Sequence, residues 1–181
     1  AREYMLHRVS SADARFKEEW ITYYSPKDHL IDSNTPTLGT TPLYRVMTID
    51  PAMSPVGDAL AGVVTGTSFH DFTDVLDLLL FRGNLDEGVG RLVDMMERHR
   101  PNFIGLEEFA LQAMYRVLLE KEIKRRGLYF NIQAVGRDSK KKKAARIESL
   151  QPIMAQRRLR FLPEHRALVD QFLLWDPISK T

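Results

Sequence analysis

The first third of the chain contains an alternation of apolar and polar residues that predicts a β-strand at residues 44–50 (YRVMTID). Successive side chains of a strand point to opposite faces, so Val46, Thr48 and Asp50 are expected to share one face. Pro51 cannot donate a ladder hydrogen bond, and the strand should therefore end at Asp50. A carboxylate at the end of a largely apolar strand is costly unless it is paired, hydrogen-bonded or metal-bound. Asp50 is therefore a candidate site residue, the alternative being an acceptor for the turn that follows.

The same reading of the whole chain predicts a sequence of further strands and helices. Strands are expected at 59–67, 73–81, 103–106 and 129–135, with a short edge strand at 158–162. Helices are expected at 13–23, 85–100, 111–126, about 139–155 and 164–175. Residues 1–41 are interpreted as a connecting segment with one helix, because 25–41 are rich in Pro, Asp, Ser and Thr, and residues 42–181 as the globular domain.

From residue 44 onward the predicted order is three strands, then helices and strands in alternation. Such an order favours an α/β fold with a mixed five-stranded sheet and helices on both faces. The first three strands should form an antiparallel meander, and the fourth should lie parallel to the first after a right-handed crossover. This arrangement resembles the ribonuclease H-like fold.

Composition removes several classes of chemistry. The chain has no Cys, which excludes disulfides, thiolate metal ligands and thiol nucleophiles. Its five histidines are scattered without the paired spacing of a zinc site. It has neither a phosphate-binding glycine loop nor a Gly-x-Ser-x-Gly nucleophile motif. No apolar run approaches the ~18 residues of a membrane span.

Positive charge is concentrated in one stretch although the net charge is only +2. The basic residues of this stretch are Arg137, Lys140, Lys141, Lys142, Lys143, Arg146, Arg157, Arg158 and Arg160. Such a block favours a polyanionic partner. The alternative is a solvated basic loop and helix face.

Glu107 follows the fourth predicted strand and is a second candidate acid. Its position favours a metal-binding role for Asp50. If the two strands are parallel neighbours, both acids lie at carboxyl ends, where open α/β sheets bind ligands. Converging carboxylates favour a cation between them, and Mg²⁺ or Mn²⁺ prefer oxygen ligands. The alternative for Glu107 is an acid at a helix N-terminus, a role that Glu108 fills more naturally. Asp58, after Gly57, is a third candidate metal ligand, the alternative being an exposed turn acid.

Four short motifs resemble one known family. Residues 14–24 (ARFKEEWITYY) resemble the segment that follows the family's ATPase domain. Residues 48–52 (TIDPA) with Gly57-Asp58 resemble its first metal-binding motif, and residues 104–108 (IGLEE) followed by Gln112 resemble its second acidic strand. Residues 143–147 (KAARI) resemble its Lys-x-x-Arg-Ile stretch. In this order and spacing, the motifs are similar to the C-terminal nuclease domain of the large terminase subunit of tailed bacteriophages.

The resemblance implies an endonuclease that cuts double-stranded DNA concatemers with two Mg²⁺ or Mn²⁺ ions. It implies that Asp50 bridges both ions, that Glu107 holds the ion on the leaving-group side or positions water, and that Asp58 is an adjustable ligand. Lys143 and Arg146, then Lys142, Arg157, Arg158 and Arg160, are expected to contact DNA phosphates.

The resemblance also implies a setting for the protein. The partners would be the portal of the procapsid and the small terminase subunit, with no membrane, and the location would be the host cytoplasm. An ATPase domain is expected before this chain. A further acidic cluster is expected after Trp175-Asp176-Pro177, so that the domain is expected to be truncated at Thr181.

Two other interpretations remain open at this point. The first is another ribonuclease H-like nuclease, of the Holliday-junction resolvase or transposase type, which would share the acidic site. The second is a non-catalytic DNA-binding or docking module, in which the acids only support the fold.

Overall fold

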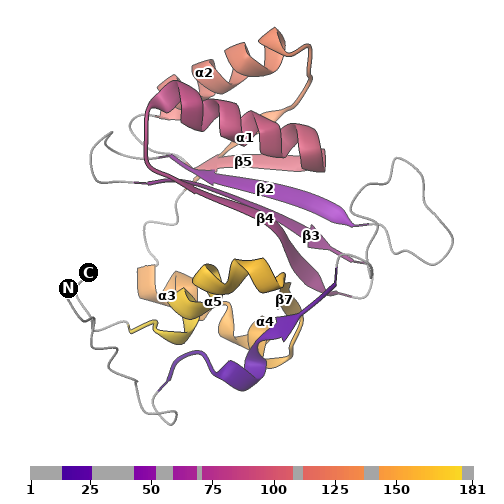
Figure 1. The fold of residues 1–181 in the computed structure, drawn as a ribbon, viewed down its shortest axis with the longest axis vertical. Helices are drawn as coiled ribbons and strands as arrows, with labels where there is room; N and C mark the ends of the chain where they lie inside the picture. The colour runs from indigo at the N-terminus through magenta and orange to yellow at the C-terminus, as the bar shows by residue number, and fades with distance from the viewer. Residues whose placement is uncertain are drawn as a thin grey trace, which may run out of the picture. The chain divides into compact units, whose positions relative to one another are not determined.

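The computed structural model describes residues 14–25, 43–51, 59–68, 71–107, 112–136 and 143–176. The chain divides into two compact units (Figure 1). We call Ser25–Asp138 the central unit, and Ala1–Tyr24 together with Ser139–Thr181 the terminal unit. Among the described residues, no helix combines the length and apolar character needed to cross a membrane.

The central unit contains a mixed five-stranded sheet. Its strands are β2 (Tyr44–Asp50), β3 (Leu60–Thr67), β4 (Thr73–Phe81), β5 (Phe103–Glu107) and β6 (Ile132–Val135). They lie in the order β4-β3-β2-β5-β6. The first three are antiparallel neighbours, whereas β5 runs parallel to β2, and β6 runs parallel to β5. The predicted meander and the predicted parallel pairing of the fourth strand with the first are both confirmed.

Two helices, α1 (Leu85–His99) and α2 (Gln112–Arg125), pack against each other over one face of this sheet (Figure 1). The residues of the central core are almost fully buried: Met47, Ile49, Ile104 and Leu106 from the sheet, and Leu92, Val93 and Met96 from α1. The other helices belong to the terminal unit, so the expected helical cover of the second face stays a prediction.

Local signals set the ends of α1. The Asn84 side chain accepts a hydrogen bond of 2.7 Å from the backbone N–H of Glu87, which caps the first turn. At the other end, Arg100 is left-handed with φ 45° and its N–H donates to the Met96 carbonyl. Gly88 permits close packing, because a Cβ there would lie 2.8 Å from Cδ2 of Leu60 on β3.

The loop after α2 shortens the next strand relative to the prediction. Gly127, with φ 67°, and Leu128 close the helix by donating to the carbonyls of Lys124 and Ile123. Residues 126–128 therefore form the C-terminal cap of α2, and β6 begins at Ile132 rather than at Tyr129.

The terminal unit combines a two-stranded parallel ladder with short helices. Strand β1 (Thr22–Tyr23) pairs with β7 (Leu159–Phe161). The helices are α3 (Lys143–Glu148), α4 (Gln151–Ala155) and α5 (Arg166–Leu173), with 3₁₀ turns η1 (Glu18–Trp20) and η3 (Pro163–His165). Phe172 places its ring 5.1 Å from the ring of Phe16 and 6.1 Å from that of Phe161. These aromatic rings form the core of the unit.

Two sequence predictions are wrong in this unit. The helix expected at 13–23 is replaced, over the described residues, by η1 and β1, because the chain extends to pair with β7 and Tyr24 donates its N–H to the Phe161 carbonyl at 3.0 Å. The helix expected at 139–155 is divided into α3 and α4 by a turn at Ser149-Leu150, and Pro152 lies in the first turn of α4. The described residues therefore contain seven strands and not the five of the predicted sheet, because the edge strand expected at 158–162 forms β7 and because β1 was not predicted.

Candidate metal and nucleic-acid site

Asp50 and Glu107 end two neighbouring parallel strands. The last paired residues of β2 and β5 are Ile49 and Leu106, and each strand continues by one residue, to Asp50 and to Glu107. Neighbouring strands are about 4.8 Å apart, and residues at the same register share a face of the sheet. The two acids therefore lie side by side at the carboxyl end of the parallel pair, Asp50 exposed and Glu107 partly exposed.

The acids occupy the face of the sheet that α1 does not cover. Ile49, one residue before Asp50, is buried and pairs with Gly62 of β3. A Cβ on Gly62 would lie 2.8 Å from Cδ2 of Leu92, so this side of the sheet meets α1. Because side chains alternate along a strand, Asp50 points to the opposite side.

Gly105 lies two residues before Glu107 on the same face. It pairs with Thr48 of β2 and with Gln133 of β6. A Cβ at Gly105 would lie 2.7 Å from Cγ2 of Val135, the residue that pairs with Glu107. Only glycine leaves room for Val135 to pack beside the acid.

The two acids provide the donor chemistry of a hard cation. Mg²⁺ and Mn²⁺ prefer carboxylate oxygens, and two carboxylates at one place fit that preference. Across the described ranges of the chain, no group of three or more His, Asp or Glu residues is arranged to hold a metal. Asp58, the third predicted ligand, lies outside the described residues. The structure therefore brings together two of the three predicted ligands.

Most of the predicted DNA-binding residues lie in the terminal unit. Lys143 is exposed and Arg146 partly exposed on α3. Arg157 is exposed with φ 57°, Arg158 is partly exposed, and the guanidinium of Arg160 on β7 lies 5.7 Å from the centre of the Tyr24 ring. Lys142 lies outside the described residues. Their role in binding DNA stays a prediction.

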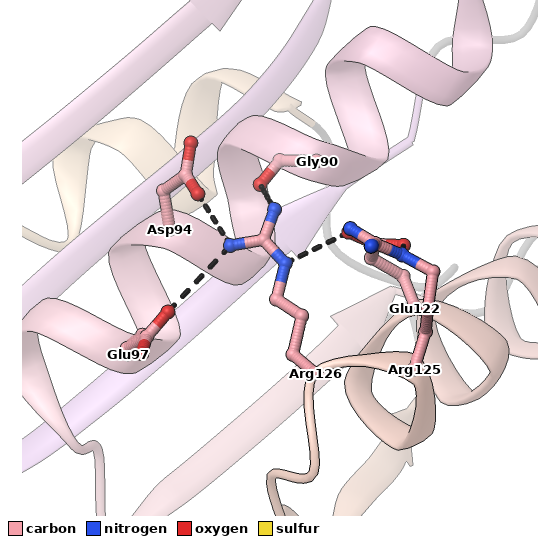
Figure 2. Close-up of polar contacts among 6 residues, drawn as sticks. All are labelled: Gly90, Asp94, Glu97, Glu122, Arg125 and Arg126. Carbon is pink, nitrogen blue, oxygen red and sulfur yellow. Dashed lines mark hydrogen bonds and ion pairs between the residues drawn. The ribbon is translucent and has the colours of Figure 1, made fainter.

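A charged cluster that the sequence analysis missed joins α1 to α2 (Figure 2). Arg126 donates to Asp94 at 2.5 Å, to Glu122 at 2.7 Å and to the Gly90 carbonyl at 3.1 Å, and lies 3.6 Å from Glu97. Hydrogen bonds from Arg125 and then Arg126 lower the pKa of Glu122 to about 2. The four-residue spacing of Glu122 and Arg126 is visible in the sequence. The contact of Arg126 with Asp94 is visible only in the fold.

A second charged cluster joins β4 to the end of α1. Oδ2 of Asp77 accepts from Arg98 at 2.8 Å and lies 2.9 Å from Nε2 of the buried His99. Arg45 of β2 donates to the His99 carbonyl at 2.8 Å. Burial alone would raise the pKa of Asp77, but the hydrogen bond and charge of His99 and the charge of Arg98 lower it below its usual value. This cluster fixes the end of α1 against the sheet.

Comparison with protein-family models gives no match, and neither does comparison with curated protein sequences. Three solved structures illustrate the structural similarity found. RuvC of Thermus thermophilus, in complex with a Holliday junction substrate, is 19% identical, with a TM-score of 0.39 over 51% of this chain and 63% of RuvC. The large terminase nuclease from the thermophilic phage G20c is 11% identical, with a TM-score of 0.46 over 84% of this chain and 74% of the other.

The yeast mitochondrial Holliday junction resolvase Ydc2 is 13% identical, with a TM-score of 0.47 over 82% of this chain and 73% of Ydc2. The chain thus spans less than two thirds of RuvC. At these identities and TM-scores, the similarities do not distinguish a terminase nuclease from a resolvase.

Proposed function

We propose that this chain is a metal-dependent endonuclease domain, of the kind found in phage large terminase subunits, that cuts double-stranded DNA. The observation that carries the proposal is the in-register placement of Asp50 and Glu107 at the ends of β2 and β5. The strand arrangement supports a ribonuclease H-like assignment, because it contains the antiparallel meander and the parallel pairing of β2 with β5 on which the resemblance to that fold was based. The four terminase-like motifs support the finer assignment.

Asp50 and Glu107 would hold Mg²⁺ or Mn²⁺ through their carboxylate oxygens, with Asp58 as the proposed third ligand. When bound, such ions activate water and stabilise the departing oxygen in phosphodiester hydrolysis. The chain itself supplies a fixed pair of carboxylates, because both acids end strands whose buried residues lock the register. Two neighbouring negative charges disfavour an approaching phosphate, so DNA contacts must come from other residues.

The exposed Lys143 and the arginines of the terminal unit are proposed to contact phosphates. Such contacts release counterions, so binding should depend steeply on salt and little on sequence. The proposal includes the wider role that the resemblance implies: a full-length packaging protein in the host cytoplasm whose partners are the procapsid portal and the small terminase subunit.

Nicking of supercoiled plasmid in Mg²⁺ or Mn²⁺ tests the proposed activity. The variants are Asp50→Asn and Glu107→Gln, which remove charge with little change of shape, and the control is Glu120→Gln, an exposed acid on α2. Because the resemblance implies a further acidic cluster after Pro177, each variant is also made in a longer chain that extends past Thr181.

We expect metal-dependent nicking by the wild type and by Glu120→Gln, and a loss of at least about 100-fold in Asp50→Asn and Glu107→Gln, since each removes a ligand on which the reaction depends. If both lengths of the wild type are inactive with either metal, the nuclease assignment is wrong and a non-catalytic module takes its place. Selective cutting of four-way junctions over plasmid would instead favour a resolvase.

A further inference from the structure

The two acids lie in a row of five residues that crosses the sheet at one register. Leu80 of β4 pairs with Ala61 of β3, and Ala61 pairs with Asp50. Glu107 stands beside Asp50, and Glu107 pairs with Val135 of β6. We call these five residues the acidic row. The ladder between β3 and β4 is regular from Leu60 to Val64, so Leu80 lies on the same face of the sheet as Ala61 and Asp50.

Both ends of the acidic row are exposed aliphatic side chains. Leu80 is 60% exposed and Val135 is 40% exposed. Leu80 faces away from α1, since Phe81, its neighbour, packs against Gly88, where a Cβ would lie 3.1 Å from the Phe81 ring. An exposed leucine and an exposed valine on either side of two carboxylates form a surface that is acidic in the middle and apolar at both ends.

Neutral residues make up the rest of this face. On the described strands of the central unit, the residues of this face outside the acidic row are Tyr44, Val46, Thr48, Val63, Thr65, Thr67, Thr73, Val75, Leu78, Phe103, Gly105 and Gln133. None of these residues is basic, so none can neutralise a phosphate. Over the described strands, a DNA strand that brings a phosphate to Asp50 and Glu107 would therefore meet neutral side chains on this face, not cations.

The spacing of the row suits a nucleic acid. With about 4.8 Å between strands, Leu80 lies roughly 10 Å from Asp50, and Val135 lies roughly 5 Å from Glu107. These distances correspond to roughly three and one and a half steps of about 3.4 Å along a DNA strand. Side chains at these positions would be within reach of sugars and base edges on either side of a phosphate held over the acids.

We propose that Leu80 and Val135 are positioning residues for double-stranded DNA, contacting sugar and base-edge carbons on both sides of the phosphate that is cut. This inference rests on the proposed nuclease function and deepens it. The contacts are apolar, so they add affinity and fix where the strand lies without releasing counterions. They differ in this respect from the phosphate contacts proposed for the terminal unit.

The test is binding of a fluorescent 30-base-pair duplex by the whole chain, measured by anisotropy between 50 and 200 mM salt, with Ca²⁺ in place of Mg²⁺ so that a hard cation occupies the carboxylates while the duplex is not cut. The variants are Leu80→Ser and Val135→Ser. Val117→Ser is the matched control, because Val117 is 62% exposed on α2, over the other face of the sheet. Leu80→Met keeps an apolar side chain of similar size and checks that loss of apolar area is the cause.

We expect Leu80→Ser and Val135→Ser to weaken binding about three- to tenfold at every salt concentration, with the slope of log affinity against log salt unchanged. Val117→Ser and Leu80→Met should bind like the wild type. In the nicking assay, the two serine variants should raise KM with little change in kcat, and should alter the positions of the cuts.

Wild-type affinity in both serine variants, or a changed salt slope, overturns the positioning role and leaves the nuclease proposal intact. Failure of the wild type to bind duplex at any salt concentration would instead count against the nuclease proposal itself, and the positioning role would fall with it.

Discussion

Single residues of the central unit carry roles that their chemistry explains. Asp50 and Glu107 hold charge at the ends of strands whose preceding residues, Ile49 and Leu106, are fully buried. Gly105 leaves space that Val135 fills beside Glu107. Asp77 has a different role, because its partly buried carboxylate contacts His99 and Arg98 within the fold. Asp77, in the middle of β4, therefore has a structural role, whereas Asp50 and Glu107 at strand ends are candidate ligands.

The lowered pKa of Asp77 predicts a pH-dependent contribution to stability. A carboxyl whose pKa is lower in the folded than in the unfolded state stabilises above its unfolded value, near 3.9, and loses this contribution as pH falls through the folded value. At pH 7, Asp77→Asn should lower the free energy of unfolding by about 1–2 kcal/mol.

Urea unfolding at a series of pH values from 7 to 3 measures this difference. The gap between wild type and Asp77→Asn should shrink below about pH 4, as the wild-type carboxylate is protonated. Glu120→Gln, which changes an exposed acid on α2, is the control. A gap that stays constant over the whole range would show that the charge of Asp77 does not stabilise the fold.

At the scale of elements, most strands and helices of the central unit were predictable to within one or two residues. The strand β2 and the helix α1 are set by local periodicity and by caps such as Asn84, which the sequence displays. The pairing of β2 with β5 follows from the crossover rule, and with it the meeting of Asp50 and Glu107.

Elements that depend on distant partners were not predictable in this way. Residues 14–23 have aromatic spacing suited to an α-helix. They form η1 and the extended strand β1 instead, because β1 pairs with β7, more than 130 positions later in the chain. Leu80 and Val135 lie in the same row as the two acids only because of the register of four ladders. Periodicity sets the type of an element, whereas register decides which residues share a row.

The Arg126 cluster predicts how strongly α2 is held to α1. Arg126→Gln leaves Asp94, Glu97 and Glu122 without their shared cation. It should cost about 1–2 kcal/mol of unfolding free energy, because three hydrogen bonds are lost but solvent screens the contacts with the exposed Asp94 and Glu97.

Arg125→Gln is the matched control for this change. Arg125 is 66% exposed and its contact is with Glu122 on its own helix, so its loss should cost clearly less than the loss of Arg126. Urea unfolding at pH 7 compares the two variants. Equal losses would contradict a central role for Arg126 in joining the helices.

At the scale of the whole molecule, the chain separates its candidate functions between two units. The central unit carries the acidic pair on a five-stranded sheet, and the terminal unit carries Lys143 and the arginines on α3 and around β7. The acidic pair suits metal-dependent chemistry at a phosphate. The basic residues of the terminal unit suit binding of a polyanion such as DNA, which contains that phosphate. The account as a whole depends on Asp50 and Glu107 acting together as one metal site.

Thermal unfolding in a titration of Mn²⁺ tests this claim most directly. A ligand that binds only the folded state stabilises it by about 2.7 kcal/mol at 100 times its Kd, which corresponds to a rise in Tm of roughly 5–10 °C for a chain of this size. We predict this rise for the wild type and for Glu120→Gln, and its loss in both Asp50→Asn and Glu107→Gln. An unchanged wild-type Tm, or a rise that survives both substitutions, would contradict the account.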